Sequence, residues 1–352
     1  MSDLVVALDV GKTNLRVEVR ERGNCRLRVG EAVRGWMGAP GPRAALLAHL
    51  AEVCGRLPDA RSVTSVGAGI AGYDSAADEE KAEVSRALQL ALPGARVRVA
   101  SDARTAHLGA FRGGPGALLV AGTGAVALAV DPAGASHWAG GLGPVLGDEG
   151  SGGWIGREGC LAAARSIDGR GPPTGLAQRC ERTFGVPATQ LGALLAASPS
   201  PAGLFGRFAS DVLEAWLDGD EQAGRIAEHA ATHLAAAAIA VLCRLDAQNR
   251  QFAVAGGLST HATFAAAVTS RVVAAVPEAV CVPARGDALD GAALLASSAL
   301  SAFERVPHPV GLVVPTGETA VLPWRYDRVA QPAARAAAAR HSAGLGARLP
   351  VR

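Results

Sequence analysis

The chain has 352 residues, of which 49% are hydrophobic and 19% are charged, so it is long enough for two domains and can bury a substantial core. Its formal net charge is +2 and it has no long basic run, which argues against nucleic-acid binding through a phosphate-tracking surface. The longest glycine-free apolar stretch, residues 234–243, is about half of what a membrane span requires. The six cysteines are scattered, without a CxxC pair or a Cys/His ligand spacing. We therefore expect a reduced, soluble, cytoplasmic protein that uses neither a membrane nor a zinc ion.

The N-terminal part of the chain is predicted to be an α/β unit that opens with a hairpin. Residues 3–9 form an apolar run that ends in the turn VGKTN, and LRVEVR at 15–20 alternates as a half-exposed strand does. After this hairpin, the apolar spacing predicts helices over 43–57, 76–91 and 104–111, and strands over 62–70 and 95–102, the last of which ends on Asp102.

The opening pattern recurs further along the chain. GALLVAGTGAVALAV at 116–130 is again an apolar strand, a small Gly/Thr turn and an apolar strand, which indicates an internal duplication. Helices dominate 154–250, and the clearest covers about 221–245, with Asp218 and Asp220 before it as caps. The remaining predicted elements are strands over 251–260 and 279–284, a helix over 287–300, and a decaying pattern from about residue 306 onward.

Three glycine turns each follow an apolar strand: DVGKT at 9–13, AGTGA at 121–125 and AGGLS at 255–259. Glycine exposes backbone N–H groups without Cβ crowding, so an anion can approach closely. The first turn also carries Asp9, whose carboxylate suits a hydrated Mg²⁺. The chain has no GxxxxGK[ST] motif and no GxGxxG after a strand, so neither a P-loop nor a Rossmann site is expected.

Two further places carry carboxylates with two open interpretations. Asp102 at a strand-to-helix junction is either a general base or a cap of the helix that follows. In GGLGPVLGDEGSGGWIG at 140–156, Asp148 and Glu149 either accept hydrogen bonds from sugar hydroxyls or, with Ser151, stabilise the start of a helix near 154. A third alternative has Glu149 contact metal-bound water.

The ordered motifs LDVGKTN, AGIAGYDS, VASDARTAHLGAF, LVAGTGAVALAV, GPVLGDEGSGGWIG, VAGGLS and LDGAALLA resemble the N-acetylglucosamine kinase and BadF/BadG/BcrA/BcrD-type ATPase family. That family belongs to the sugar kinase, actin and chaperone-ATPase superfamily. The resemblance covers roughly residues 3–300, and it implies an α/β fold of two ribonuclease-H-like (actin-like ATPase) domains with an interdomain cleft. We expect an N-terminal domain over 1–102, completed by the helix near 287–300, a C-terminal domain over 103–286, and a peripheral or flexible tail over 306–352.

The resemblance also implies roles for individual residues. Asp102 would be the catalytic base and Asp9 would hold the metal. The expected ATP and phosphate ligands are Gly11, Lys12, Thr13, Gly122, Thr123, Gly124, Gly256 and Gly257. The expected sugar ligands are Gly72, Asp102, Thr123, Gly143, Asp148 and Glu149.

These roles predict an enzyme that uses ATP and Mg²⁺ to phosphorylate the 6-hydroxyl of an amino sugar, with N-acetylglucosamine first and glucosamine second. The expected partner is a small-molecule amino sugar, and the sequence leaves open whether the chain forms a homodimer. The chain departs from the family pattern at Lys12, where many relatives have glycine, and at RGWMGAPGP (34–42), which lacks the Asn of relatives that bind N-acetylglucosamine. The kinase scaffold is therefore better supported than the acetamido sugar.

Two alternatives from other classes compete with the kinase. One is the branch of the family that activates dehydratases through an iron–sulfur cluster, but that branch has a Cys just before its AGTG turn and GALLVAGTG has none. The other is a non-catalytic ATP- or sugar-binding sensor, against which Asp9 and Asp102 speak because both candidate catalytic carboxylates are present.

Overall fold

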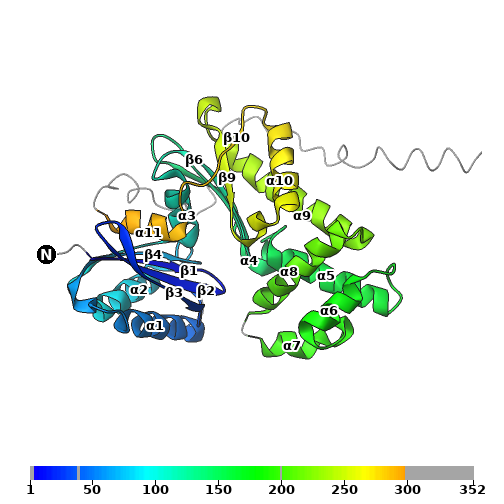
Figure 1. The fold of residues 1–352 in the computed structure, drawn as a ribbon, viewed down its shortest axis with the longest axis horizontal. Helices are drawn as coiled ribbons and strands as arrows, with labels where there is room; N and C mark the ends of the chain where they lie inside the picture. The colour runs from blue at the N-terminus through cyan, green and yellow to red at the C-terminus, as the bar shows by residue number, and fades with distance from the viewer. Residues whose placement is uncertain (1–3, 38–39, 199, 298–352) are drawn as a thin grey trace, which may run out of the picture. The chain divides into compact units, whose positions relative to one another are not determined.

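The computed structural model describes residues 4–37, 40–198 and 200–297, all of which belong to one compact unit, Met1–His308 (Figure 1). The predicted tail over 306–352 and the last residues of the predicted helix over 287–300 lie outside the described residues. Within the described part, two five-stranded sheets form the centres of two lobes. Each lobe begins with the hairpin that its sequence pattern predicts.

The first lobe is built on a sheet in the order β3-β2-β1-β4-β5. Strands β1 and β2 and strands β2 and β3 pair antiparallel, whereas β4 and β5 add in parallel. The strands are β1 (Leu4–Val10), β2 (Asn14–Glu21), β3 (Asn24–Ala32), β4 (Val63–Ile70) and β5 (Arg96–Ala100). Strand β3 is an addition to the sequence prediction, because its side chains are largely exposed and polar and leave no core-facing apolar pattern.

Four helices cover the first sheet on two faces (Figure 1). They are α1 (Pro40–Gly55), α2 (Asp78–Ala91), α3 (Asp102–Phe111) and α11 (Ala288–Ala296). Alternation along β1 decides the faces: Val6 and Leu8 join the core with α1 and α2, whereas Ala7 packs with α11. Helix α11 therefore returns from the far end of the described chain to complete the first sheet. We keep 102/103 as the proposed domain boundary. It assigns α3 to the second domain, although α3 packs with α11 on the first sheet and contacts both β4 and β6.

The second lobe repeats this topology, which confirms the predicted duplication. Its strand order, listed from β8, is β8-β7-β6-β9-β10, which matches β3-β2-β1-β4-β5 of the first sheet position by position. The pairs β8–β7 and β7–β6 are antiparallel, and the pairs β6–β9 and β9–β10 are parallel, as in the first sheet. The strands are β6 (Gly116–Ala121), β7 (Ala125–Val130), β8 (Ser136–Gly140), β9 (Gln251–Ala255) and β10 (Val280–Cys281). The predicted strand over 279–284 is thus only two residues long, and β8 is an addition.

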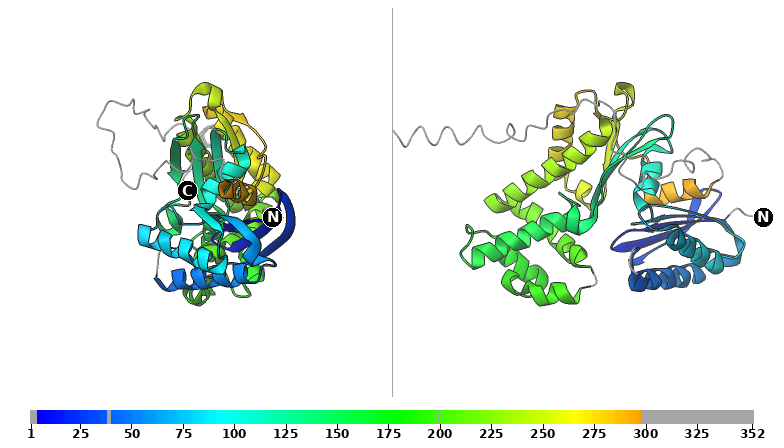
Figure 2. Two further views of the ribbon diagram at one scale, coloured as in Figure 1. Left: turned by 90° about the vertical axis from the view of Figure 1, so that its left-hand side faces the viewer. Right: turned by 180° about the vertical axis from the view of Figure 1, so that it is seen from behind.

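Helices in the second lobe fill the interval between β8 and β9 and follow β9. They are α4 (Gly143–Leu146), α5 (Gly152–Ile167), α6 (Leu176–Phe184), α7 (Leu191–Ala197), α8 (Pro201–Leu217), α9 (Glu221–Leu242) and α10 (Ala262–Ala275). Short 3₁₀ helices lie at 188–190, 247–249 and 257–260 in this lobe and at 60–62 in the first. Asp220 caps α9 by accepting from the N–H groups of Gln222 and Ala223, as predicted, whereas Asp218 ends α8. Figure 2 shows both lobes from two further sides.

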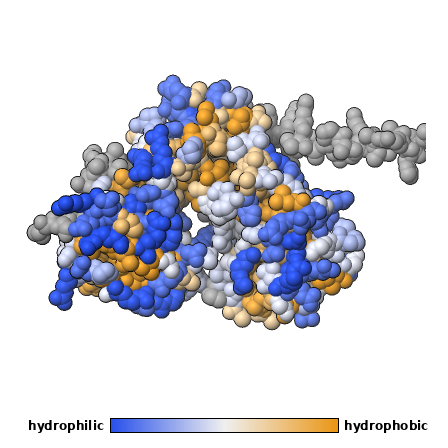
Figure 3. All heavy atoms as spheres, viewed as in Figure 1, coloured by the Kyte–Doolittle hydropathy of each residue, from blue (hydrophilic) through white to orange (hydrophobic). Residues whose placement is uncertain are grey.

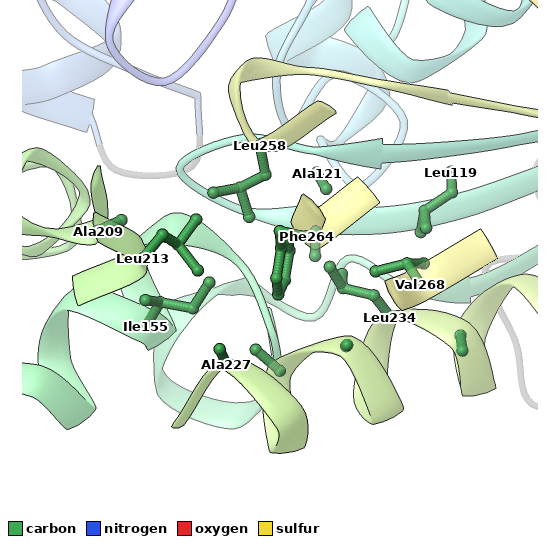
Figure 4. Packing of buried hydrophobic residues seen from close by; sticks show 14 of the residues in the cluster. Leu119, Ala121, Ile155, Ala209, Leu213, Ala227, Leu234, Leu258, Phe264 and Val268 are labelled. Carbon is green, nitrogen blue, oxygen red and sulfur yellow. The ribbon is translucent and has the colours of Figure 1, made fainter. Parts of the chain in front are cut away.

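The larger core lies in the second lobe, where helices pack on the sheet through small side chains. Figure 4 shows Leu119 and Ala121 of β6 facing Phe264 and Val268 of α10. Helix α9 contributes a face of buried alanines (Ala223, Ala227, Ala230, Ala231, Ala235 and Ala238). Because alanine has no side chain beyond Cβ, this long helix can lie close to its neighbours without gaps.

No helix among the described residues is both long and apolar enough to cross a membrane. On the face drawn in Figure 3, hydrophilic residues are spread over both lobes, with apolar residues between them.

Candidate active site

Two of the three glycine turns are in direct contact. The turn at 9–13 joins β1 to β2, and Gly11 closes it with a backbone hydrogen bond. The turn at 121–125 joins β6 to β7 in the other lobe. The hydroxyl oxygens of Thr13 and Thr123 lie 3.2 Å apart, close enough for a hydrogen bond. The structure thus brings together two turns that are more than a hundred positions apart in sequence.

The third turn, at 255–259, lies against the second. Strands β6 and β9 are parallel neighbours, so their carboxyl ends meet at one edge of the sheet. Gly256 has φ +95° and packs so closely on the carbonyl of Ala121 that a side chain would overlap it. Gly122 and Gly257, in contrast, have no heavy atom within 4 Å of the place where a Cβ would stand. The space beside both glycines is therefore open, although the Gly122 N–H already donates to the Gly124 carbonyl at 2.9 Å.

Asp102, which was predicted to end a strand, is instead the first residue of α3, two positions after β5 ends at Ala100. The helix is capped by Ser101, whose hydroxyl accepts from the Arg104 N–H, so capping does not require the Asp102 side chain. The Asp102 carboxylate accepts from the Ala103 N–H at 2.9 Å. Burial, followed by the negative charge of Asp9, raises the pKa of Asp102 to about 6. A carboxylate with a pKa near the working pH suits general-base chemistry.

A buried ion pair that was not predicted from the sequence holds the start of α3. Asp74 accepts from the Ser101 hydroxyl at 2.7 Å and from the Arg104 Nε at 3.0 Å. Arg104 also donates to the Ser136 hydroxyl at 3.4 Å, and its guanidinium lies 5.4 Å from the ring centre of Trp138 in β8. Asp74 is the only carboxylate of the AGYDS motif, which is the sequence feature that could have identified it as a site residue. This cluster positions Asp102 between the two lobes.

Asp9 is paired within its own hairpin. Arg16, its cross-strand partner in β2, donates to the Asp9 Oδ2 from Nε at 2.9 Å and from Nη2 at 2.7 Å. The same guanidinium donates to Asp287, the N-cap of α11, at 2.9 Å. Both bonds from Arg16 to Asp9 use one carboxylate oxygen, so Oδ1 is the atom available to metal-bound water. Burial raises the pKa of Asp9, and Arg16 opposes this shift.

The acidic bend holds one buried and one exposed carboxylate. Asp148 is 3% exposed and has φ +56°, a left-handed conformation that is uncommon outside glycine. Its Oδ2 accepts from the Lys12 Nζ at 2.7 Å, and its Oδ1 accepts from the Ala125 N–H at 3.3 Å. Glu149 is exposed. The cap of α5 is Ser151, whose hydroxyl accepts from the Trp154 N–H, so the interpretation of Glu149 as a helix cap is not needed.

The apolar side chains of the bend point outward, which the sequence did not predict. Leu142, Val145 and Leu146 are 65%, 100% and 74% exposed. Gly143, a predicted sugar ligand, begins α4 with φ +79° and has open space beside it. The bend therefore buries the Asp148 carboxylate and exposes its apolar side chains, whereas a hydrophobic core buries apolar side chains and leaves charged ones exposed.

Several glycines that follow the acidic pair serve close packing. The Gly152 and Gly153 N–H groups donate to the carbonyls of Gly122 and Thr123 at 2.7 and 3.0 Å, so the start of α5 is attached to the second turn. A Cβ on Gly156 would overlap the Phe205 carbonyl of α8. Gly152, Gly153 and Gly156 therefore serve contacts within the second lobe.

Gly72, also a predicted sugar ligand, lies in the loop after β4. It has φ +80°, and a Cβ there would stand 3.3 Å from the Met37 Cβ. The same loop carries Asp74, which contacts the start of α3, so Gly72 lies in the segment that holds Asp102. Trp36, next to Met37, is 42% exposed.

The residues fit a nucleotide that brings its own magnesium ion. Among the described residues, no group of three or more His, Cys, Asp or Glu side chains could hold a metal alone. Mg²⁺ usually keeps several waters and takes one or two carboxylates together with substrate phosphates. Asp9 and Asp102 repel each other enough to raise the pKa of Asp102, and a cation relieves such repulsion. Asp9 would hold the hydrated metal, and the open turns would face the phosphates.

Comparison with known proteins agrees with this geometry. The model of the BadF/BadG/BcrA/BcrD ATPase family matches residues 9–296. No curated protein matches the chain. Among solved structures, a candidate N-acetylglucosamine kinase from Chromobacterium violaceum is 24% identical, with 84% of this chain and 99% of that chain covered and a TM-score of 0.65.

Two further structures share the fold. A candidate N-acetylglucosamine kinase from Porphyromonas gingivalis is 19% identical, with 83% of this chain and 98% of that chain covered and a TM-score of 0.63. A ROK family glucokinase from Streptomyces griseus, solved with glucose and AMPPNP, is 18% identical, with the same coverage and a TM-score of 0.52. At these identities the likeness concerns the fold, and it confirms the predicted α/β architecture of two actin-like ATPase lobes.

Proposed function

Because the chain belongs to the BadF/BadG/BcrA/BcrD ATPase family, we propose that it is an ATP-dependent sugar kinase whose general base is Asp102. The observation that carries the proposal is the position of Asp102. It stands at the start of α3, where burial, followed by the negative charge of Asp9, raises its pKa to about 6 and the positive charge of Lys12 from the same glycine turn opposes this shift. One base beside a phosphate-binding turn is the minimum that phosphoryl transfer requires.

The side chains divide the work as follows. The Asp102 carboxylate accepts the proton of the attacking sugar hydroxyl. Asp9 would hold the hydrated metal ion, and Arg16 keeps the Asp9 side chain in place through two hydrogen bonds. Bound Mg·ATP supplies the transferred phosphoryl group and the metal that neutralises its charge. The space beside Gly122 and Gly257 is the proposed place for the nucleotide.

The proposed substrate is an amino sugar phosphorylated on its 6-hydroxyl, with N-acetylglucosamine first and glucosamine second. The 6-hydroxyl is primary and can extend past the ring to Asp102. Asp148, Glu149, Gly72 and Gly143 are the proposed contacts for the rest of the sugar. Two solved relatives in fold are described as candidate N-acetylglucosamine kinases, which supports this order of preference.

A coupled ADP-release assay over glucose, glucosamine, N-acetylglucosamine, N-acetylmannosamine, N-acetylmuramic acid and ribose tests the proposal. We expect the best kcat/KM on N-acetylglucosamine, with the phosphate on O6 by ³¹P NMR of the product. Best turnover of a sugar without a 2-nitrogen would overturn the amino-sugar claim and leave the kinase claim standing. Asp102→Asn should abolish sugar-dependent ADP release while AMPPNP still binds.

A second function is favoured by the family itself, which takes its name from ATPases. In that case ATP is hydrolysed to support a partner protein, and the sugars leave the rate unchanged. ADP release that is equal with and without every sugar would favour this ATPase role. Nucleotide binding with no ADP release at all would favour a sensor.

A further inference from the structure

Two residues proposed to serve different substrates are bound to each other. Lys12 lies in the first phosphate turn, and Asp148 is a proposed sugar ligand. The Lys12 Nζ lies 2.7 Å from the Asp148 Oδ2 across the junction of the two lobes. Lys12 retains 41% of its side-chain exposure, whereas Asp148 retains 4%. The pair therefore joins a partly exposed cation to a buried anion.

The position of the ammonium group is the second observation. A Cβ added to Gly124 would stand 2.5 Å from the Lys12 Nζ and 2.8 Å from the Asp148 Oδ2. The ammonium group thus rests on the second glycine turn, beside the contact between Thr13 and Thr123. A phosphate at these turns would lie within a short side-chain movement of Lys12. Because lysine is a point charge on a flexible stem, it can turn toward that phosphate at little cost.

Asp148 cannot lose Lys12 without a replacement. Its other oxygen, Oδ1, accepts only a long hydrogen bond from the Ala125 N–H at 3.3 Å within the described part of the chain. A buried carboxylate left without its cation is strongly unfavourable. Sugar hydroxyls can donate hydrogen bonds to Oδ2 in place of Lys12, since an ionised carboxylate only accepts hydrogen bonds.

We propose that Lys12 and Asp148 form an exchange pair that couples the two substrates. With no substrate bound, the Lys12 ammonium group binds the Asp148 carboxylate, so neither group is available to its own substrate. Bound nucleotide draws Lys12 to its phosphates and frees Asp148 for sugar hydroxyls, and bound sugar satisfies Asp148 and frees Lys12. The inference rests on the proposed kinase function. It assigns Lys12 as a phosphate ligand that is bound to Asp148 until the nucleotide arrives.

Thermodynamic linkage makes the coupling reciprocal and measurable. If nucleotide raises the affinity for sugar by some factor, sugar must raise the affinity for nucleotide by the same factor. Coupling between sites typically amounts to about 5–150-fold. We expect the wild-type protein to bind N-acetylglucosamine at least about fivefold more tightly when Mg·AMPPNP is saturating, for the reason that the nucleotide releases Asp148.

The experiment is titration calorimetry of N-acetylglucosamine and of glucosamine, with and without saturating Mg·AMPPNP. Lys12→Met should bind sugar alone about as tightly as the wild type binds it with nucleotide, and its coupling should fall to within about twofold of unity. Lys12→Arg keeps the charge and should keep coupling. The matched control is Lys81→Met, which removes the only other lysine, a partly exposed residue of α2 that lies 3.5 Å from Asp78.

The outcomes separate the inference from the proposed function. Coupling that persists in Lys12→Met, or sugar affinity that is lost in that variant, would show a static pair and overturn the inference alone. Nucleotide binding by the wild type without any sugar binding would overturn the proposed function as well. Asp148→Asn gives a second arm, because it should weaken sugar binding at least about tenfold. Nucleotide affinity measured without sugar should rise by about fivefold or more, because Lys12 is no longer held by Asp148, and an unchanged nucleotide affinity would contradict the exchange.

Discussion

Replacing Asp102 by Asn should make the protein inactive and, at neutral pH, more stable. The carboxylate has its pKa raised from 3.8 to about 6 in the folded state, because it is buried near Asp9. The folded state therefore holds the proton more tightly than the unfolded chain does. Between these two pH values the unfolded chain loses its Asp102 proton before the folded state does, so the free energy of unfolding falls as pH rises. The stability that the retained proton contributes is fully present below pH 3.8 and is lost as pH rises through about 6.

The magnitude follows from the size of the shift. A difference of about 2 pKa units, at 1.36 kcal/mol each, corresponds to about 3 kcal/mol of lost stability above pH 7, as an upper bound. Asn keeps the shape of the side chain and an oxygen that can accept from the Ala103 N–H, but it carries no charge. Asp102→Asn should thus gain up to about 3 kcal/mol at pH 7.5, or roughly 5 °C in Tm, and little at pH 4.

The assay is calorimetric unfolding of wild type and variant at pH 4, 6 and 7.5, alongside sugar-dependent ADP release at pH 7.5. Asp78→Asn is the control, because its side chain is 98% exposed, and it should change stability by less than about 0.5 kcal/mol at every pH. A variant that is no more stable than wild type at pH 7.5 would refute the buried-charge argument. Activity within about threefold of wild type would remove Asp102 from the role of base, since general-base catalysis contributes on the order of 10²–10⁴-fold.

Three further outcomes can be checked. Wild-type kcat/KM for the sugar should fall about tenfold per pH unit below about pH 6, where Asp102 becomes protonated, and a flat profile from pH 5 to 8 would contradict this. Asp9→Ala should raise the Mg²⁺ concentration needed for half-maximal activity by about tenfold or more, and normal activity at limiting Mg²⁺ would contradict the metal role. Gly156→Ala should lower stability by about 3 kcal/mol in urea unfolding, because its Cβ would overlap the Phe205 carbonyl, whereas Gly192→Ala in open space should change it by no more than about 1 kcal/mol.

The order of elements could be predicted from sequence because it depends on local patterns. Apolar strands followed by glycine turns at 9–13 and 121–125 predicted two hairpins and a duplication, and both sheets have the same topology. Strand β3 was missed because its side chains are mostly exposed and carry no core-facing apolar pattern. Asp102 was identified from its place after an apolar strand, which is a local feature as well.

The contacts within the candidate site were decided by tertiary structure alone. Lys12 and Asp148 are 136 positions apart, and no local pattern says that their side chains meet. The same holds for Asp74, which binds the start of α3 only because the loop after β4 and the end of β5 reach one edge of the sheet. Burial of Asp148 and exposure of Val145, three positions earlier, likewise follow from how the bend meets the second turn. Sequence determines which groups are available, and the packing of the two lobes determines which of them meet, because charge pairing and desolvation depend on distances in space rather than on distance along the chain.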